Sequence, residues 1–99
     1  MALTGKQRRH LRALGHHLNA TVQLGQKGLT PELTKKLVEE LELHELVKLK
    51  VGQDTVPAKE AGPAIAKSAE AELVQVIGRT VLLYKARKKD PEIRLPRKA

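Results

Sequence analysis

The hydrophobic positions of this chain follow two different spacings. After Pro31, leucines recur every four residues among lysines and glutamates, which is the spacing of a helix with one buried face. Further along, Val47, Leu49 and Val51 alternate with lysines, which indicates a strand with one packed and one wet face. Extended along the chain, these patterns predict three helices, at about residues 4–14, 31–43 and 55–71, and four strands, at residues 21–24, 46–51, 73–77 and 80–85.

The order of these elements, α-β-α-β-α-β-β, predicts an α/β fold. Two strand–helix–strand units favour parallel pairing with right-handed crossovers, and Gly78-Arg79 fits a two-residue hairpin between the last two strands. We therefore predict a two-layer domain with a four-stranded mixed sheet over residues 1–85, followed by a basic tail, extended or mobile, over residues 86–99. Gly62-Pro63 leaves the third helix either bent or split in two, because proline disrupts a helix interior.

Composition limits both the core and the chemistry. Tyr84 is the only aromatic residue, so the core must consist of Leu, Val, Ile and Ala. There is no cysteine, which excludes disulfides, cysteine metal sites and thiol nucleophiles. The net charge of +8 is concentrated at the ends, because residues 1–20 carry four basic and no acidic side chains and residues 85–99 carry seven basic and two acidic ones. This asymmetry indicates a polyanionic partner.

The first predicted helix combines an apolar line with a basic stripe. The leucines that recur at helical spacing on one side are Leu3, Leu11, Leu14 and Leu18. At about 100° per residue, three arginines fall together beside that line: Arg8, Arg9 and Arg12. No acidic residue of the same helix can pair with them, so we predict that these arginines contact phosphates.

The strongest candidate site is a glycine-rich loop between a strand and a helix. The strand at residues 21–24 runs into Gly25-Gln26-Lys27-Gly28, and Thr30 and Pro31 then supply an N-cap and a first helical residue. Two glycines permit close approach of another backbone, the helix N-terminus favours an anion, and Lys27 adds a positive charge. The motif lacks the Gly-Lys-Ser/Thr of a P-loop and the third glycine of a dinucleotide fingerprint. Its spacing is typical of the KH-type loop that clamps a nucleotide backbone.

No group of residues predicts catalysis or cofactor binding. Ser68 is the only serine, and His16 and His17 are adjacent with no third ligand nearby. We expect no enzymatic activity, metal, cofactor or small-molecule substrate. The N-terminal residues lack an apolar signal region, and no apolar run reaches the roughly 18 residues of a membrane-spanning helix. We therefore expect a cytoplasmic monomer with no membrane partner.

Four segments, taken together and in order, carry a family resemblance. They are Leu3-Thr4-Gly5-Lys6-Gln7-Arg8 with Leu11 and Leu14, Leu24-Gly25-Gln26-Lys27-Gly28-Leu29-Thr30, His44-Glu45-Leu46-Val47-Lys48-Leu49-Lys50, and Val74-Gln75-Val76-Ile77-Gly78-Arg79-Thr80-Val81-Leu82-Leu83-Tyr84-Lys85. This pattern resembles the CRM domain (chloroplast RNA splicing and ribosome maturation), in particular the free-standing bacterial YhbY-like proteins. Lys85 departs from the arginine that is common in the family at this position, which keeps the charge but loses bidentate geometry.

The resemblance implies both a fold and a function. The fold is similar to the C-terminal domain of bacterial translation initiation factor three, and the glycine loop binds RNA. Free-standing bacterial members associate with precursors of the large ribosomal subunit, and members are not enzymes. The resemblance therefore implies a non-catalytic protein that binds ribosomal RNA during large-subunit assembly.

The residues predicted to contact RNA are the glycine loop and the basic side chains of the two ends and the hairpin: Gly25, Gln26, Lys27, Gly28, Arg8, Arg9, Arg12, Arg79, Lys85, Arg87, Lys88 and Lys89. Lys27→Glu should weaken RNA binding, and Gly28→Asp should weaken it more strongly. The alternative is a basic protein-interaction module that docks on an acidic protein or another anionic surface. Such a module does not need the glycine loop.

Overall fold

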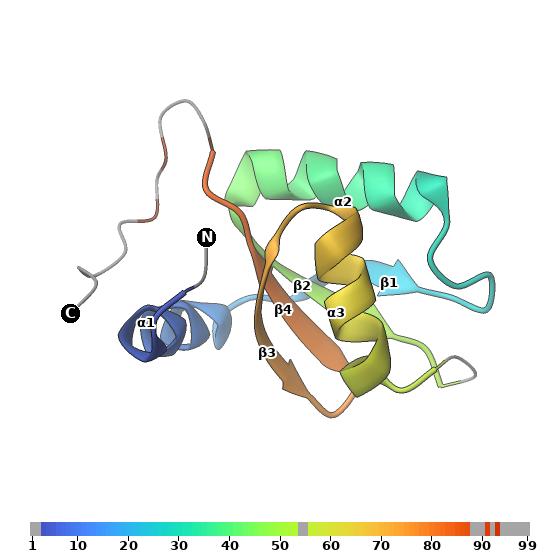
Figure 1. The fold of residues 1–99 in the computed structure, drawn as a ribbon, viewed down its shortest axis with the longest axis horizontal. Coiled ribbons are helices and arrows are strands. Elements are labelled where there is room, and N and C mark those ends of the chain that lie inside the picture. The colour runs from blue at the N-terminus through green and yellow to red at the C-terminus, as the bar shows by residue number, and fades with distance from the viewer. Residues whose placement is uncertain (1–2, 54–55, 88–90, 92, 94–99) are drawn as a thin grey trace.

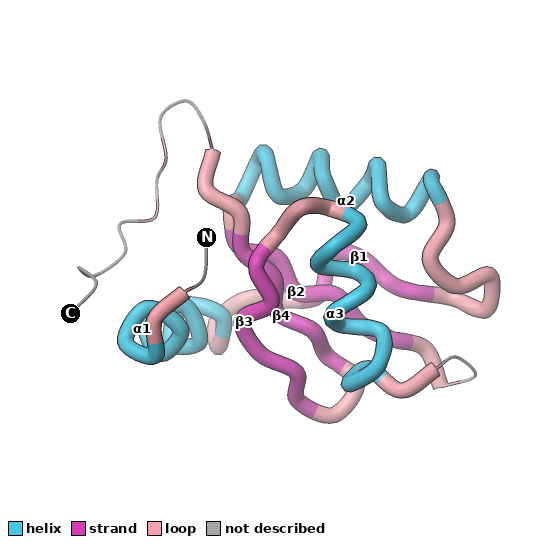
Figure 2. Tube along the Cα trace, in the orientation of Figure 1, coloured by secondary structure: helices cyan, strands magenta, loops and turns pink. Residues whose placement is uncertain are grey.

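A computed structural model describes residues 3–53, 56–87, 91 and 93 of the protein. These residues form three helices and four strands in the predicted order, arranged as in Figures 1 and 2. The helices are α1 (Gly5–Gly15), α2 (Pro31–His44) and α3 (Ala58–Ser68), and the strands are β1 (Ala20–Leu24), β2 (Leu46–Val51), β3 (Glu72–Ile77) and β4 (Thr80–Tyr84). The predicted element types are thus confirmed, although α3 is shorter at both ends than expected.

Local sequence explains where the first two helices begin. Thr4 and Gln7 form a reciprocal capping box on α1, in which each side chain accepts a hydrogen bond from the backbone N–H of the other residue, at 3.1 and 3.0 Å. Thr30 caps α2 by accepting from the Leu33 N–H at 3.2 Å, and Pro31 occupies the first turn as predicted. Thr55, where the third helix was predicted to begin, lies outside the described residues.

The sheet has the strand order β1-β2-β4-β3, which corrects one predicted pairing. β1 and β2 pair in parallel as expected, but β2 and β3 are not neighbours, because β4 lies between them and is antiparallel to both. The burial of β4 explains its central place: Val81, Leu82, Leu83 and Tyr84 are all buried, so both of its faces need cover. β3, with partly exposed polar residues, lies at the edge.

Hydrophobic residues pack on both faces of the sheet. α2 and α3 cover one face with the larger core, in which Leu37, Leu41 and Ile65 lie against Leu49 and Leu83. The predicted α/β domain with a four-stranded mixed sheet is therefore confirmed, and α1 covers part of the opposite face. There, a smaller cluster joins Leu11 to Leu46, Val74, Leu82 and Tyr84.

The prediction that Leu14 lies on the apolar face of α1 is wrong. Leu14 is 39% exposed, whereas Gln7 and Gly15 are buried on the face that meets the sheet. A Cβ at Gly15 would lie 2.7 Å from Leu82 Cδ2, so α1 approaches β4 closely here and a larger residue would require the Leu82 side chain to shift. The helix is rotated toward its small and polar residues, a rotation that leucine spacing alone does not indicate.

The Gly62–Pro63 pair lies within one helix and does not split it into two pieces. Gly62 is buried against β3, where a Cβ would lie 3.1 Å from Val76 Cγ2 and 3.3 Å from Leu73 Cδ1. Pro63 is exposed, so the ring points away from the sheet. Glycine lets α3 approach the sheet closely, and proline removes the intrahelical bond that its missing N–H would donate.

The chain after β4 turns back onto a buried acid. Glu45 is completely buried with φ of 63°, and its carboxylate accepts from the Arg87 N–H at 3.0 Å and from the Ile93 N–H at 2.9 Å. Ile93 also packs against the α1-side cluster. At Arg87 and Ile93 the expectation of a mobile tail is therefore wrong, because the backbone N–H groups of both residues are bound to Glu45.

Tyr84 provides a direct optical test of this packing. Burial, and secondarily the negative charge of Glu45, raise the pKa of the Tyr84 phenol above its ordinary value of 10.0. Because the folded state holds the neutral phenol, this contribution to stability is complete below pH 10 and is lost as the pH rises through the raised pKa. Tyrosinate absorbance should therefore titrate at higher pH in the folded protein than in urea. Identical titration curves would contradict the burial of the ring.

Candidate nucleic-acid interface

The glycine loop, residues 25–28, is a tight turn between β1 and α2. The Gly28 N–H donates to the Gly25 carbonyl at 3.0 Å, which closes the turn. Gln26 and Lys27 stand exposed at its tip. Gly28 has φ of 71°, a conformation that side-chain-bearing residues seldom adopt, so the turn itself accounts for this glycine.

The turn does not require a glycine at position 25. Its φ lies outside the left-handed region, and a Cβ built on it would meet no atom within 4 Å. Neither backbone conformation nor packing within the described residues therefore requires glycine at this position. A bare backbone beside an exposed lysine allows another chain to come within contact distance. Gly25 is thus the residue whose geometry best fits the predicted role of the loop, which is to let an RNA backbone approach closely.

The N-terminus of α2 offers less to an anion than the sequence suggested. Thr30 accepts from the Leu33 N–H through its side chain and from the Thr34 N–H through its carbonyl, at 3.2 and 3.0 Å. Pro31 has no N–H, and Glu32 adds a negative charge in the first turn. Anion binding at this end therefore depends on the loop backbone and Lys27 rather than on the helix N-terminus.

Backbone hydrogen bonds bring three connections to one end of the sheet. The Gly52 N–H donates to the Leu24 carbonyl at 2.9 Å, and the Val51 N–H donates to the Arg79 carbonyl at 2.7 Å. The glycine loop, the end of β2 and the β3–β4 hairpin thus share this end (Figure 1). Arg79 is exposed there, as predicted for a hairpin tip.

Lys50 also lies at this end of the sheet, although it was not among the residues predicted from the sequence to contact RNA. It is exposed, and it pairs in register with Gln23 of β1 and Thr80 of β4. The alternation in β2 had already placed Lys50 on the wet face of the strand. What the alternation could not give is the register that puts this lysine beside the strand leading into the glycine loop.

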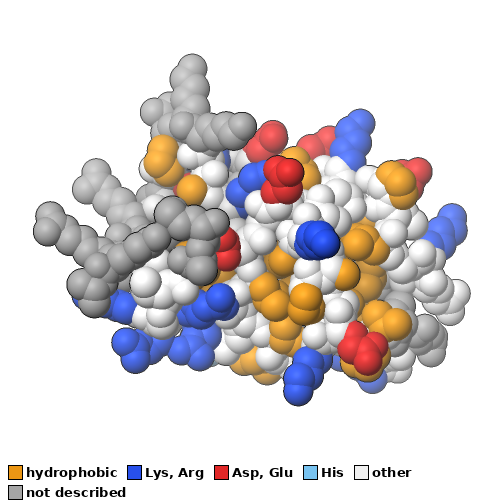
Figure 3. All heavy atoms as spheres, viewed as in Figure 1, with side chains coloured by type: hydrophobic (Ala, Val, Ile, Leu, Met, Phe, Trp, Pro, Cys, Tyr) orange, Lys and Arg blue, Asp and Glu red, His pale blue; other side chains and the backbone are white. Residues whose placement is uncertain are grey.

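The three arginines of α1 have different environments. Arg8 is half-buried, and its Nη1 donates to the carbonyls of Leu73 and Val74, so this side chain holds α1 against β3. Arg9 is exposed, and Arg12 is half-buried in a depression of about 140 Å³ with His16, Lys48 and Thr80 among its lining residues. Lys and Arg side chains gather over α1 in Figure 3. Of the three predicted arginines, Arg8 is bound to β3, so Arg9 and Arg12 remain as candidates to contact a ligand.

Two predicted contacts lie at the opposite end of the sheet. The Lys85 ammonium donates to the carbonyl of Ala69, which caps α3, at 3.2 Å. Arg87 follows β4 and is bound through its backbone to Glu45. β4 runs away from the hairpin, so the structure does not bring these residues together with the glycine loop. Lys88 and Lys89 lie outside the described residues.

Other ligand chemistry has little support in the described part of the chain. No three or more His, Asp or Glu side chains there are grouped to hold a metal ion. None of the described helices has the length and apolar character that crossing a bilayer requires. Tyr84 is only 5% exposed, so it cannot serve as a stacking surface for bases.

These features define a small α/β domain that presents an exposed Gly-x-x-Gly turn at one end of a mixed sheet. The family model of the CRS1/YhbY (CRM) domain matches residues 3–85, and the chain belongs to this family. The resemblance drawn from the four sequence segments is thereby confirmed. The matched region runs from just before the α1 cap to just after β4, and so contains every helix and strand of the described chain.

Individual relatives agree with this assignment. The chain is 41% identical over 95 residues to "Probable RNA-binding protein YqeI" of Bacillus subtilis, covering 95% of this chain and 99% of that protein. It is 39% identical over 97 residues to an RNA-binding protein of Haemophilus influenzae, covering 97% of each. The solution structure of SAV1595 from Staphylococcus aureus superposes with a TM-score of 0.81 at 38% identity, over 95% of this chain and 99% of that one.

Proposed function

We propose that this protein binds RNA without catalysing a reaction, and that the glycine loop is the centre of its interface. The observation that carries the proposal is the open backbone at Gly25 beside the exposed Lys27. The relatives named as RNA-binding proteins support the same class of ligand. Phosphate groups meet the loop backbone and Lys27. Lys50 and Arg79 add positive charge at the same end of the sheet, and Arg9 and Arg12 add it on α1.

The finer proposal concerns which RNA is bound. We propose ribosomal RNA in cytoplasmic precursors of the large ribosomal subunit, since the resemblance to free-standing bacterial YhbY-like proteins implies this partner. Sedimentation of a cell lysate on a sucrose gradient tests it. At low salt the protein should migrate with particles slightly lighter than the mature large subunit, and it should leave them as salt rises. Migration with soluble protein at every salt concentration would contradict this assignment.

The phosphate contacts predict a specific response to salt. About five cationic contacts on a single strand give a slope of about −3.5 in a plot of log affinity against log salt. Lys27→Ala should reduce the magnitude of this slope by about 0.7, because one phosphate contact is lost. Binding of a fluorescent single-stranded RNA, titrated at several salt concentrations, measures it.

Lys67→Ala is the matched control for this exchange. Lys67 is also an exposed lysine, but it lies in the last turn of α3, near the Lys85 end of the sheet. Its removal changes the net charge equally and should leave the slope unchanged. Equal reductions in the two variants would mean that the loop holds no particular contact and that only net charge matters.

A further inference from the structure

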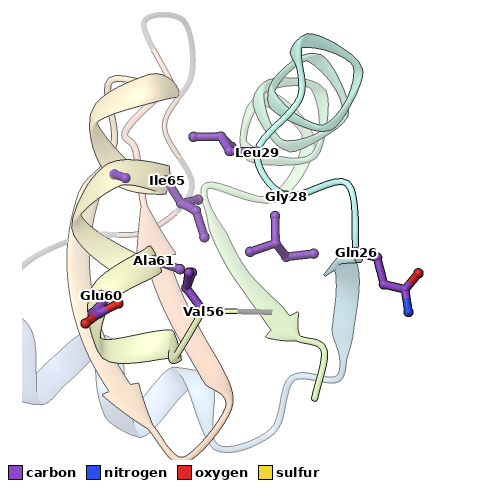
Figure 4. Close-up of a pocket in the computed structure, with 9 residues that line it drawn as sticks. Gln26, Gly28, Leu29, Val56, Glu60, Ala61 and Ile65 are labelled. Carbon is purple, nitrogen blue, oxygen red and sulfur yellow. The ribbon is translucent and has the colours of Figure 1, made fainter. Parts of the chain in front are cut away.

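An apolar groove of about 510 Å³ lies between the glycine loop and α3 (Figure 4). Its volume is in the range of small-ligand sites. Residues of the loop form one wall and residues of α3 form the other. The complete lining is Leu24, Gln26, Gly28, Leu29, Val56, Glu60, Ala61, Ala64 and Ile65.

The interior of the groove is aliphatic. Leu24, Ala61 and Ile65 are buried and belong to the larger core. At the rim, Leu29 is 41% and Val56 53% exposed, which makes them two of the most exposed large hydrophobic residues in the described chain. Hydrophobic side chains also collect around α3 in the space-filling view (Figure 3). Two exposed apolar side chains at the rim of an aliphatic groove make this surface a candidate ligand site.

The polar lining residues do not point into this interior. In Figure 4, Gln26 points away from α3, and Glu60 lies on the outer side of α3. Leu29 instead points across the groove toward α3, and Ile65 points into it. Among the labelled lining residues, the side chains that point into the groove are therefore apolar.

We infer that this groove receives unpaired nucleobases of an RNA strand whose phosphates lie on the glycine loop. The inference rests on the proposed function and extends it. Gln26 and Gly28 belong to both the loop and the groove wall, so a strand that crosses the loop passes the mouth of the groove. Single-stranded RNA exposes flat apolar base faces that proteins bury. The single aromatic residue of the chain, Tyr84, is buried and cannot bind them.

Charge favours RNA over a peptide as the occupant. The loop beside the groove carries the exposed Lys27, and Lys50 and Arg79 are exposed at the same end of the sheet. A polyanion is attracted to this surface, whereas a cationic or neutral peptide gains nothing from it. Two properties follow: the protein prefers single strands to duplexes, in which bases are stacked and paired, and it discriminates weakly among base types.

An abasic probe tests the groove separately from the phosphate contacts. The probes are a ten-nucleotide single-stranded RNA and the same strand with three adjacent abasic sites. The wild-type protein should bind the abasic strand about fivefold more weakly, since apolar contact is lost while the phosphates remain. The double variant Leu29→Ser/Val56→Ser should bind both strands equally, at the affinity of the wild-type protein for the abasic strand.

A second variant covers the case in which the double variant does not fold. Ala64 is exposed on α3 and lines the groove, so Ala64→Gln fills it with an uncharged side chain that a helix tolerates. It should also remove the difference between the two strands. The control is Leu43→Ser, which alters a leucine that is 63% exposed near the far end of α2 and should behave as wild type.

Each outcome decides something different. Equal binding of both strands by the wild-type protein would overturn the groove assignment and leave the phosphate contacts intact. Failure of the wild-type protein to bind either strand would overturn the proposed function itself. A dimer in sedimentation equilibrium that Ala64→Gln dissociates would show that a second copy, and not RNA, covers the groove.

Discussion

Gly25→Asp should reduce RNA affinity by about 30-fold or more while leaving the fold intact. The position has open space around it and an ordinary φ, so the new side chain neither clashes nor strains the turn. On the bound strand, however, the aspartate would stand where a phosphate approaches the backbone. Steric exclusion and like-charge repulsion together account for a loss of about 2 kcal/mol or more. Fluorescence anisotropy with single-stranded RNA measures the affinity, and thermal unfolding checks the fold.

Gly5→Asp is the matched control for this exchange. Gly5 is also exposed with no atom within 4 Å of a new Cβ, and it begins α1, where an acidic residue is favourable. Both variants lose the same net charge. Wild-type affinity in Gly25→Asp, or an equal loss in Gly5→Asp, would remove the glycine loop from the interface.

The structure also changes how Gly28→Asp should be interpreted. The sequence predicts it as the stronger of two loop exchanges. Because Gly28 has φ of 71°, any side chain there strains the turn as well as obstructing a ligand. Its effect on affinity would combine both causes. Gly25 isolates the effect on binding, a distinction that needed the backbone conformation and could not come from the motif.

The fold was predictable where a local pattern has a local cause. Alternation in β2 gave its bounds and its buried face, and Thr4 and Thr30 were positioned to begin their helices. Strand order was not predictable from two strand–helix–strand units, since those units fix direction but not adjacency. The run of four apolar residues at positions 81–84 was the available sequence signal that this strand is central.

The candidate site was less predictable, because a basic side chain can either stabilise the fold or bind a ligand. Arg8 and Lys85 looked like phosphate contacts, yet both donate to backbone carbonyls of distant segments. These partners are 65 and 16 residues away in the sequence, so no periodic pattern of residues indicates the contacts. The groove was missed for a similar reason: Leu29 and Val56 are isolated apolar residues in loops, and only the fold places them on one surface.

Glu45→Ala should destabilise the protein by about 3 kcal/mol, the largest effect we expect on folding. The exchange removes both acceptors of the Arg87 and Ile93 N–H groups, and hydrogen bonds to charged groups are worth about 1.5–3 kcal/mol each. For a domain of this size, the melting temperature should fall by about 15 °C. Glu45→Gln retains one acceptor oxygen and should lie between wild type and Glu45→Ala. Calorimetry of the three proteins measures the series.

The backbone conformation at Glu45 allows the loss of the carboxylate to be separated from the strain of a positive φ. Its φ of 63° is unfavourable for a residue with a side chain, so Glu45→Gly loses the same carboxylate but gains about 1 kcal/mol from the relaxed backbone. Glu45→Gly should therefore be more stable than Glu45→Ala. If the two were equally stable, the positive φ would not be a source of strain in the native state.

The same variants separate the tail from the RNA interface. Loss of the Glu45 carboxylate should expose the chain after β4 to trypsin sooner, since Arg87 and Ile93 are no longer held. Arg87 follows the end of β4 that lies opposite the glycine loop, so RNA affinity measured well below the melting temperature should not change. A loss of affinity in folded Glu45→Gln would instead make the held tail part of the interface, and the positive surface would then extend to both ends of the sheet.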